Sequence, residues 1–173
     1  MSGILLYLVI LVFKTIEVSM ATLRIVLITK DERLKGACIG FFEVILWVFL
    51  VSTVLTNITE DPFKVVVYAL GFAIGNFVGS MIENKLAIGT TNIEAIVLKE
   101  HGKELSKKLR EHGIAVTVVD ALGMNHKREI LIMHVQRKNA RETVNLIKSY
   151  QENVVISIND IKPVYGGFKV LKK

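Results

Sequence analysis

The sequence predicts two fold classes in one chain: an α-helical membrane domain with three transmembrane helices, followed by an α+β, ferredoxin-like cytosolic domain. The first observation is that 51% hydrophobic residues and a mean hydropathy of +0.47 accompany 22% charged residues, which is too apolar for a typical soluble domain. The second is that the net charge of +6 lies entirely in residues 89–173. The third is that three long apolar stretches precede a series of short strand and helix patterns.

Composition places the domain boundary near Gly89. Residues 1–88 contain seven basic and seven acidic side chains and are neutral overall, whereas residues 89–173 contain all four histidines and the whole positive excess. The single cysteine excludes a disulfide scaffold, and the apolar content excludes a disordered chain. We therefore expect a membrane domain over residues 1–88 and a soluble domain over residues 89–173.

Three apolar stretches are long enough to span a bilayer, which requires about 20 residues. They cover about 5–28, 37–56 and 65–84. A secretory signal peptide would need positive charge before its apolar core, but the first charge, Lys14, follows thirteen uncharged residues. A buried helical hairpin in a soluble protein would need more covering protein than 173 residues supply. The sequence therefore predicts three transmembrane helices.

Loop charges predict the orientation of these helices. The first loop carries Lys30, Arg33 and Lys35, whereas the second carries only Lys64. Basic loops stay in the cytoplasm, so the N-terminus is expected outside and the C-terminal domain inside. The basic C-terminal domain agrees, because it would face anionic lipid on the inner leaflet. We predict a multi-pass plasma-membrane protein with the lipid bilayer as its first partner.

Four ionisable residues interrupt the first two spans: Lys14, Glu17, Arg24 and Glu43. Charges within the hydrocarbon are costly and usually pair or line a pathway. Lys14 precedes Glu17 by three residues, so the two can pair on one helix face. Arg24 and Glu43 lie at similar depths in antiparallel neighbours and can also pair. These charges predict either a proton or ion pathway or ion pairs that fix helix register, and we favour the ion pairs.

The third span carries glycines at four-residue spacing, at Gly71, Gly75 and Gly79. This spacing forms a groove that lets another helix approach closely. Asn76, beside the groove, can donate a hydrogen bond to a neighbouring helix. The partner helix can belong to the same chain or to another copy, and because three helices form a thin bundle we expect a homo-oligomer.

The C-terminal half alternates strand and helix patterns. Strands are expected over 93–98, 114–119, 129–135 and 154–158. Helices are expected over 102–111, ended by Gly113, and over 139–151, begun by Asn139 and Glu142 in a capping-box arrangement. Residues 120–128 are expected to form a loop. The order β-α-β-β-α-β is that of the ferredoxin-like fold, in which one sheet face stays uncovered unless a subunit or ligand covers it.

No catalytic or metal-binding pattern is present, so we predict neither an enzyme nor a cofactor or metal site. Cys38 is expected to be a small apolar filler at the start of a membrane helix. Nucleic acid is a poor fit, because the basic residues have no interleaved aromatic side chains. Basic residues at the two ends of the third strand are a candidate anion site or, alternatively, a solvated rim. They are His126, Lys127, Arg128, Arg137 and Lys138.

Several segments resemble an uncharacterised family of bacterial three-span membrane proteins. These segments are Gly40-Phe-Phe-Glu-Val-Ile-Leu-Trp47 and the run from Ala69 to Glu83 that contains the three glycines. The segment from Gly113 to Gly123, Arg128-Glu-Ile-Leu and Gly166-Gly-Phe168 resemble the cytosolic domain that this family shares with YitT-type membrane proteins. The resemblance implies a PII-reminiscent domain, a type that often forms trimers and binds small anionic effectors near residues 120–128.

Two functions fit these observations. The first is a membrane-anchored sensor or regulator whose cytosolic domain binds a small anion. The alternative is a small oligomeric transporter or channel gated by that domain, which the charged residues within the spans suggest.

Overall fold

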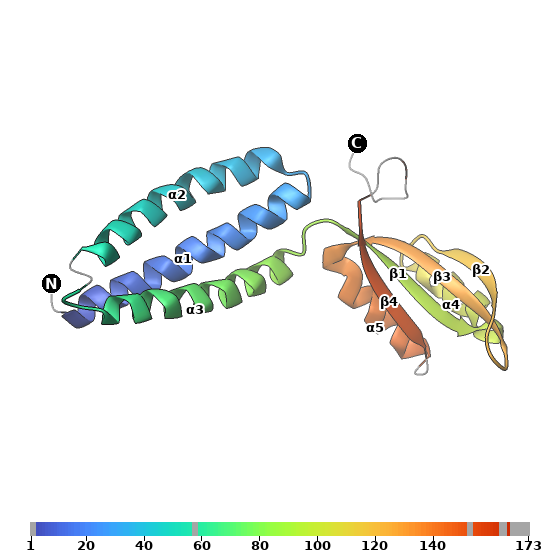
Figure 1. Cartoon of the computed structure of the whole chain (residues 1–173). Helices are drawn as coiled ribbons and strands as arrows, with labels where there is room; N and C mark the ends of the chain where they lie inside the picture. Colours follow the sequence, from blue (N-terminus) through green and yellow to red (C-terminus); the bar gives the residue numbers. More distant parts are fainter. Residues whose placement is uncertain (1–2, 57–58, 152–153, 163–165, 167–173) are drawn as a thin grey trace. The chain divides into compact units, whose positions relative to one another are not determined.

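The chain divides into two units between Leu86 and Ala87, one helical and one built on a β-sheet (Figure 1). The structure is a computed structural model, and it describes residues 3–56, 59–151, 154–162 and 166. Gly167 and Phe168, which carry part of the family resemblance, lie outside the described residues.

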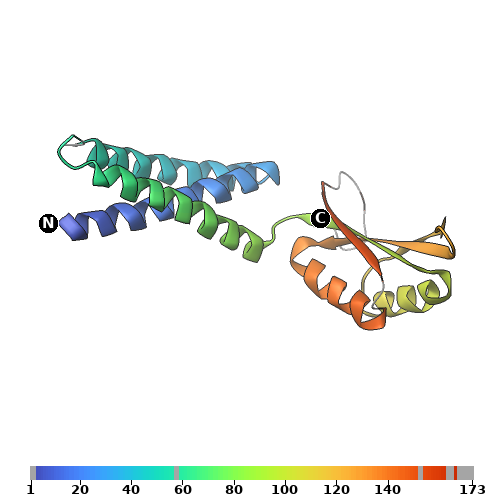
Figure 2. The ribbon, with the colours of Figure 1, turned by 60° about the horizontal axis from the view of Figure 1, so that its bottom comes forward.

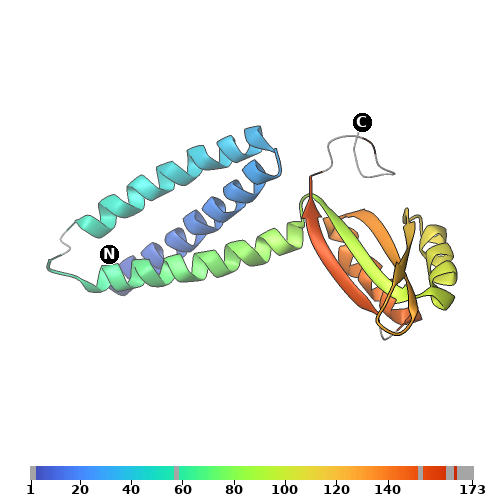
Figure 3. The same cartoon turned by 45° about the vertical axis from the view of Figure 1, so that its right-hand side comes forward.

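Three long helices form the first unit: α1 (Gly3–Thr29), α2 (Arg33–Leu55) and α3 (Phe63–Leu86). Each is long and apolar enough to cross a membrane. The helices extend a few residues beyond most ends of the predicted spans, because hydropathy locates the apolar centre of a helix and polar residues continue its hydrogen-bonded turns. Figures 1 and 3 show α1 between α2 and α3, and α1 packs against both neighbours.

The outer surface of the helical unit is apolar. Phe41 and Phe49 of α2 are 64% and 70% exposed, and Phe77 of α3 is 68% exposed. An apolar surface of this extent is unfavourable in water, whereas hydrocarbon solvates it. The three helices therefore have both the length and the outward-facing side chains that a bilayer requires.

The second unit is a four-stranded antiparallel sheet with two helices. Its elements are β1 (Thr90–Leu98), α4 (Lys99–Glu111), β2 (Thr117–Leu122), β3 (Lys127–Gln136), the short 3-10 helix η1 (Arg137–Asn139), α5 (Ala140–Tyr150) and β4 (Val155–Ile161). The strand order is β2-β3-β1-β4, and Figure 2 shows both α-helices on one face of the sheet. This arrangement confirms the predicted ferredoxin-like fold, and it places β3 between β2 and β1.

Alternate residues of the central strands form the core under the two helices. Ile93 and Val97 of β1, Leu131 and Met133 of β3 and Ile147 of α5 are completely buried. Because side chains alternate along a strand, the residues between them face the other side of the sheet. Within the described residues of this unit, no helix or strand covers that second face.

The second strand begins later than predicted, at Thr117 instead of residue 114. The backbone N–H of Ile114 donates to the carbonyl of Leu109 at 3.0 Å, and that of Gly113 donates to Arg110 at 2.8 Å. Gly113 has φ +75°, so this is the glycine-terminated helix end that the sequence predicts. Ile114 therefore belongs to the helix exit, and its β-branched side chain packs on the core.

The predicted loop over 120–128 is a tight hairpin. Asp120 and Leu122 belong to β2, and Lys127 begins β3, with Leu122 opposite Lys127. The backbone N–H of Gly123 donates to the carbonyl of His126 at 3.0 Å and closes the turn. The loop prediction was wrong at both ends because pairing with β3 orders polar residues that favour loops on their own.

The predicted capping box at the start of α5 is also wrong. Asn139 ends the 3-10 helix η1 with helical backbone angles and makes no capping hydrogen bond through its side chain. Instead, the hydroxyl of Thr143 donates to the carbonyl of Asn139 at 3.0 Å. The preceding 3-10 turn already orients the chain into the helix, so Asn139 lacks the extended conformation that a capping side chain needs.

Candidate functional site

Lys14 and Glu17 form an ion pair inside the helical unit. Lys14 Nζ donates to Glu17 Oε2 at 2.6 Å and to the hydroxyl of Tyr68 at 2.8 Å. Lys14 and Glu17 are only 3% and 5% exposed, and the ammonium also lies 4.2 Å from the centre of the Tyr68 ring. The lysine therefore pairs along α1 and bonds across to α3.

Arg24 and Glu43 join α1 to α2. Arg24 Nε donates to Glu43 Oε2 at 2.6 Å, and a terminal guanidinium nitrogen donates to Oε1 at 3.0 Å. The two parallel bonds give the bidentate geometry that arginine and carboxylate favour. A Cβ on Gly40 would lie 2.9 Å from Arg24 Cδ. The glycine at this position of α2 therefore makes room for the arginine side chain.

The glycine groove of α3 is filled by α1 of the same chain. A Cβ on Gly71, Gly75 or Gly79 would lie 2.8, 2.7 or 2.8 Å from the Cβ of Lys14, Val18 or Thr22, respectively. Asn76, which the sequence suggested as a donor to a neighbouring helix, donates instead to the carbonyl of Phe72 in its own helix.

Hydroxyl groups of α1 add polar contacts to this groove. Ser19 Oγ donates to the carbonyl of Gly75 at 3.1 Å, and Thr15 Oγ1 lies 3.4 Å from that of Gly71. Such contacts are accessible because the missing Cβ atoms expose the helix backbone. The groove therefore serves close packing within one chain.

The five basic residues proposed from the sequence as an anion site are separated in the structure. His126 and Lys127 line one pocket of the second unit. Arg128 alternates with the buried Glu129 along β3, so its side chain faces the uncovered side of the sheet. Arg137 and Lys138 lie at the opposite end of β3, in η1. There, Arg137 Nε is 3.9 Å from Asp160 Oδ1.

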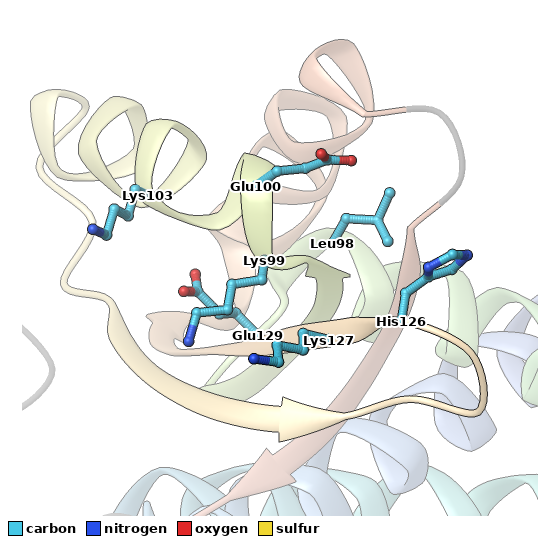
Figure 4. A pocket seen from close by; sticks show the side chains of 7 residues that line it. All are labelled: Leu98, Lys99, Glu100, Lys103, His126, Lys127 and Glu129. Atoms are coloured by element: carbon cyan, nitrogen blue, oxygen red, sulfur yellow. The ribbon is translucent and has the colours of Figure 1, made fainter.

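The pocket lies where the end of β1 and the first turn of α4 meet the β2–β3 hairpin. Its volume is about 570 Å³, and it is lined by Leu98, Lys99, Glu100, Lys103, His126, Lys127 and Glu129. In Figure 4 the ammonium groups of Lys99 and Lys127 lie near the Glu129 carboxylate, that of Lys103 lies farther away beside α4, and His126 is on the other side. The pocket is open to solvent and within the size range of small-molecule sites.

The Glu129 carboxylate lies in space that is available because residue 102 of α4 is a glycine. Glu129 follows the core alternation of β3, so its side chain points to the helix face, and it is 4% exposed. A Cβ on Gly102 would lie only 1.8 Å from Glu129 Oε2, so only glycine at this position of α4 accommodates the carboxylate. Glu129 Oε2 is buried and accepts no hydrogen bond from the described residues.

Lys99 forms an ion pair with Asp120 at the edge of the pocket. The hydrogen bond to Asp120 raises the pKa of Lys99, and the same bond lowers the pKa of Asp120. The pair's stabilisation is therefore lost as pH falls through the lowered pKa of Asp120, or as it rises through the raised pKa of Lys99. The two side chains are 46% and 75% exposed, so the effect on stability is small.

Lys103 and Lys127 are different from Lys99, because neither side-chain ammonium donates a hydrogen bond to the described residues. A second depression of about 280 Å³ adjoins the pocket and shares Lys99 and Lys127 with it. Two ammonium groups are therefore available to a bound molecule, and a third is shared with Asp120.

Sequence reasoning missed Lys99, Lys103 and Glu129. It placed Lys103 only as a member of the helix expected over 102–111 and Glu129 as the start of the strand expected over 129–135. One signal was available: Glu129 stands two residues before Leu131 in the alternation that fills the core, a position where an acidic side chain is unusual. What the sequence could not show is that α4 places Gly102 over this carboxylate.

Two family models match the chain. Residues 22–80 match the "Domain of unknown function (DUF5698)", and residues 114–166 match the "Uncharacterized protein conserved in bacteria (DUF2179)". The second match agrees with the predicted resemblance to the cytosolic domain of YitT-type proteins.

Two solved structures are also similar. A functionally unknown protein from Pediococcus pentosaceus is 12% identical, with a TM-score of 0.44 over 47% of this chain and all of its own. The DUF2179 protein from Eubacterium ventriosum is 19% identical, with a TM-score of 0.33 over 40% of this chain and 97% of its own.

Similar proteins occur in Clostridium botulinum and Alkaliphilus oremlandii. A UPF0316 protein from Clostridium botulinum (strain Hall) is 46% identical over 159 residues, which cover 92% of this chain and 94% of the relative. A UPF0316 protein from Alkaliphilus oremlandii is 37% identical over 169 residues, covering 97% and 96%. With this identity over both the apolar helices and the α+β domain, the chain belongs to the UPF0316 family.

Proposed function

We propose that this protein is a membrane-anchored regulator whose C-terminal domain faces the cytoplasm and binds a small anionic ligand in the pocket between α4 and the β2–β3 hairpin. The observation that carries the proposal is the set of three lysines, Lys99, Lys103 and Lys127, around one pocket. Lysine ammonium groups are common ligands of phosphate, and two of these three donate to no described residue.

The position of the pocket suits a regulatory role. Its residues come from two parts of the domain that are distant in sequence, the β1–α4 junction and the β2–β3 hairpin. A ligand that contacts both would favour the conformation in which they are close, and it would shift the domain's equilibrium by its preference for that conformation. The sheet face that the described residues of the C-terminal unit leave uncovered favours self-association, so we include a homo-oligomer in the proposal.

The transporter alternative has less support. The four ionisable residues that suggested it lie in two ion pairs, Lys14–Glu17 and Arg24–Glu43. Paired charges of this kind account for their presence through helix register and packing. We therefore propose a structural role for them.

Charge removal in the pocket should weaken anion binding. The full-length protein in lipid nanodiscs would be titrated with tripolyphosphate by calorimetry. We expect Lys103→Gln/Lys127→Gln to reduce the affinity about tenfold or more, because charge-assisted hydrogen bonds are lost. Asp120→Asn should raise the affinity, because it releases Lys99 from its ion pair.

A matched double variant distinguishes binding in the pocket from a general attraction by the protein's positive charge. Lys107→Gln/Lys148→Gln removes the same charge from exposed positions of α4 and α5 that do not line the pocket. It should leave the affinity nearly unchanged. If both double variants lost the same affinity for tripolyphosphate, that affinity would depend on net charge alone. This result would contradict a binding site in the pocket.

The orientation is tested by labelling with a membrane-impermeant maleimide. In a Cys38→Ala background, Met124→Cys places a thiol at a fully exposed position of the C-terminal unit, and Glu60→Cys places one at an exposed position of the second loop. We expect Met124→Cys to react only in inside-out vesicles and Glu60→Cys to react in intact cells. The reverse pattern would overturn the cytoplasmic location.

A further inference from the structure

Glu129 is a buried acidic side chain of the C-terminal unit that lines the pocket. It is 96% shielded from solvent by the rest of the chain, and its Oε2 accepts no hydrogen bond from the described residues. A buried carboxylate without a hydrogen-bond donor is costly, and buried polar atoms in proteins are nearly always paired. Glu129 also lines the pocket, so its carboxylate is a candidate contact for a bound molecule that carries a hydrogen-bond donor.

The nearby lysines do not occupy this acceptor. Lys99 donates to Asp120, and neither Lys103 nor Lys127 donates to Glu129. The pocket thus presents two complementary features: ammonium donors, which suit an anionic group, and a buried carboxylate, which suits an N–H or O–H donor. A fully ionised inorganic phosphate serves only the first feature, and it would bring its own negative charge close to Glu129.

We propose that the pocket binds a phosphate ester that also carries hydroxyl or amino groups, with its phosphate on the lysines and one N–H or O–H group donating to Glu129. This inference rests on the proposed function and specifies the ligand of the same site. A pocket of about 570 Å³ accommodates a molecule of the size of a mononucleotide or a sugar phosphate. Glu129 is then the residue that distinguishes such esters from inorganic anions.

The absence of a side chain at Gly102 allows the Glu129 carboxylate to lie where it does. A Cβ at this position would overlap Glu129 Oε2 at 1.8 Å and approach its Cδ at 2.8 Å, so Gly102→Ala must displace the carboxylate. Alanine is otherwise favoured over glycine inside a helix, and Glu129 can rotate away at its flexible end. Gly102→Ala therefore changes the position of the carboxylate while keeping its charge.

The test compares two kinds of probe on the full-length protein in nanodiscs. The esters are ribose 5-phosphate, AMP, ATP and GTP, and the inorganic probes are phosphate and tripolyphosphate. We expect at least one ester to bind about tenfold more tightly than the inorganic anion of similar charge. Glu129→Gln should weaken that ester about tenfold by removing a charge-assisted hydrogen bond. The same variant should tighten tripolyphosphate, because it removes a repulsive negative charge.

Opposite changes for the two kinds of probe are the decisive result. Gly102→Ala should also weaken the ester, with thermal unfolding of both variants measured to confirm that they are folded. Equal binding of esters and inorganic anions to the native protein, or the same change for both in Glu129→Gln, would overturn the role of Glu129 while leaving the anion site intact. Absence of binding by every probe would contradict the proposed function itself.

Discussion

Glu17→Leu is expected to destabilise the helical unit by about 3–5 kcal/mol, because it leaves the Lys14 ammonium buried without its anionic partner. Lys14 is 3% exposed, and within the described residues its ammonium would retain only the Tyr68 hydroxyl as a hydrogen-bond acceptor. The free energy of unfolding would be measured by denaturant titration in mixed micelles. The double variant Lys14→Met/Glu17→Leu should recover much of the loss, since an apolar pair of similar size replaces the ion pair.

Glu43→Leu is the matched comparison for Glu17→Leu. It also removes one carboxylate from an ion pair in the spans, but the Arg24 side chain is 34% exposed. A long basic side chain with this exposure can extend toward the polar interface, so we expect a smaller loss of stability. Equal losses in the two variants, or no recovery in the double variant, would contradict the assignment of Lys14 and Glu17 as a buried structural pair.

Gly75→Leu is expected to separate α1 from α3 and to destabilise the helical unit by about 3 kcal/mol, the upper part of the usual range for overpacking. A Cβ alone at this position would lie 2.7 Å from Val18 Cβ and 2.9 Å from the carbonyl oxygen of Thr15. Because the second contact is with backbone, the helix itself must move. The same denaturant titration measures the effect.

Gly3→Leu provides the control for Gly75→Leu. A Cβ on Gly3 would meet no atom within 4 Å, so the same change of residue should have little effect at this position. The hydrogen bond from Ser19 to Gly75 should be lost only in Gly75→Leu. A comparable loss of stability in both variants would show that the four-residue glycine spacing does not govern helix packing.

The features that sequence predicted best depend on local information. Each membrane helix is recognisable because about 20 consecutive apolar residues are sufficient to span the hydrocarbon, whatever their neighbours are. Gly113 could be identified as a helix end for the same reason, since a positive φ is a property of one residue and its adjacent turn. The order of strand and helix patterns likewise led to the ferredoxin-like fold without any knowledge of contacts.

The errors arose where pairing between distant residues overrides local preference. Asp120 favours a loop on its own, but its place opposite Glu129 in the β2–β3 ladder makes it a strand residue. The five basic residues were grouped by their nearness to one strand, yet β3 separates Lys127 from Arg137 by its full length and turns Arg128 to the other face of the sheet. The register of the strands sets where along β3 each of these residues lies and which face of the sheet its side chain occupies.

By itself, the sequence determined that the protein has three apolar spans followed by a basic α+β domain. Hydropathy, charge and the alternation of apolar residues depend only on residues that are close together in the chain. Only the tertiary structure decided that α1 fills the glycine groove of α3 and that Gly102 of α4 lies against Glu129 of β3. These contacts join residues far apart in the chain, and their distances depend on how whole helices and strands pack. The candidate ligand site is therefore a product of packing, which no local pattern contains.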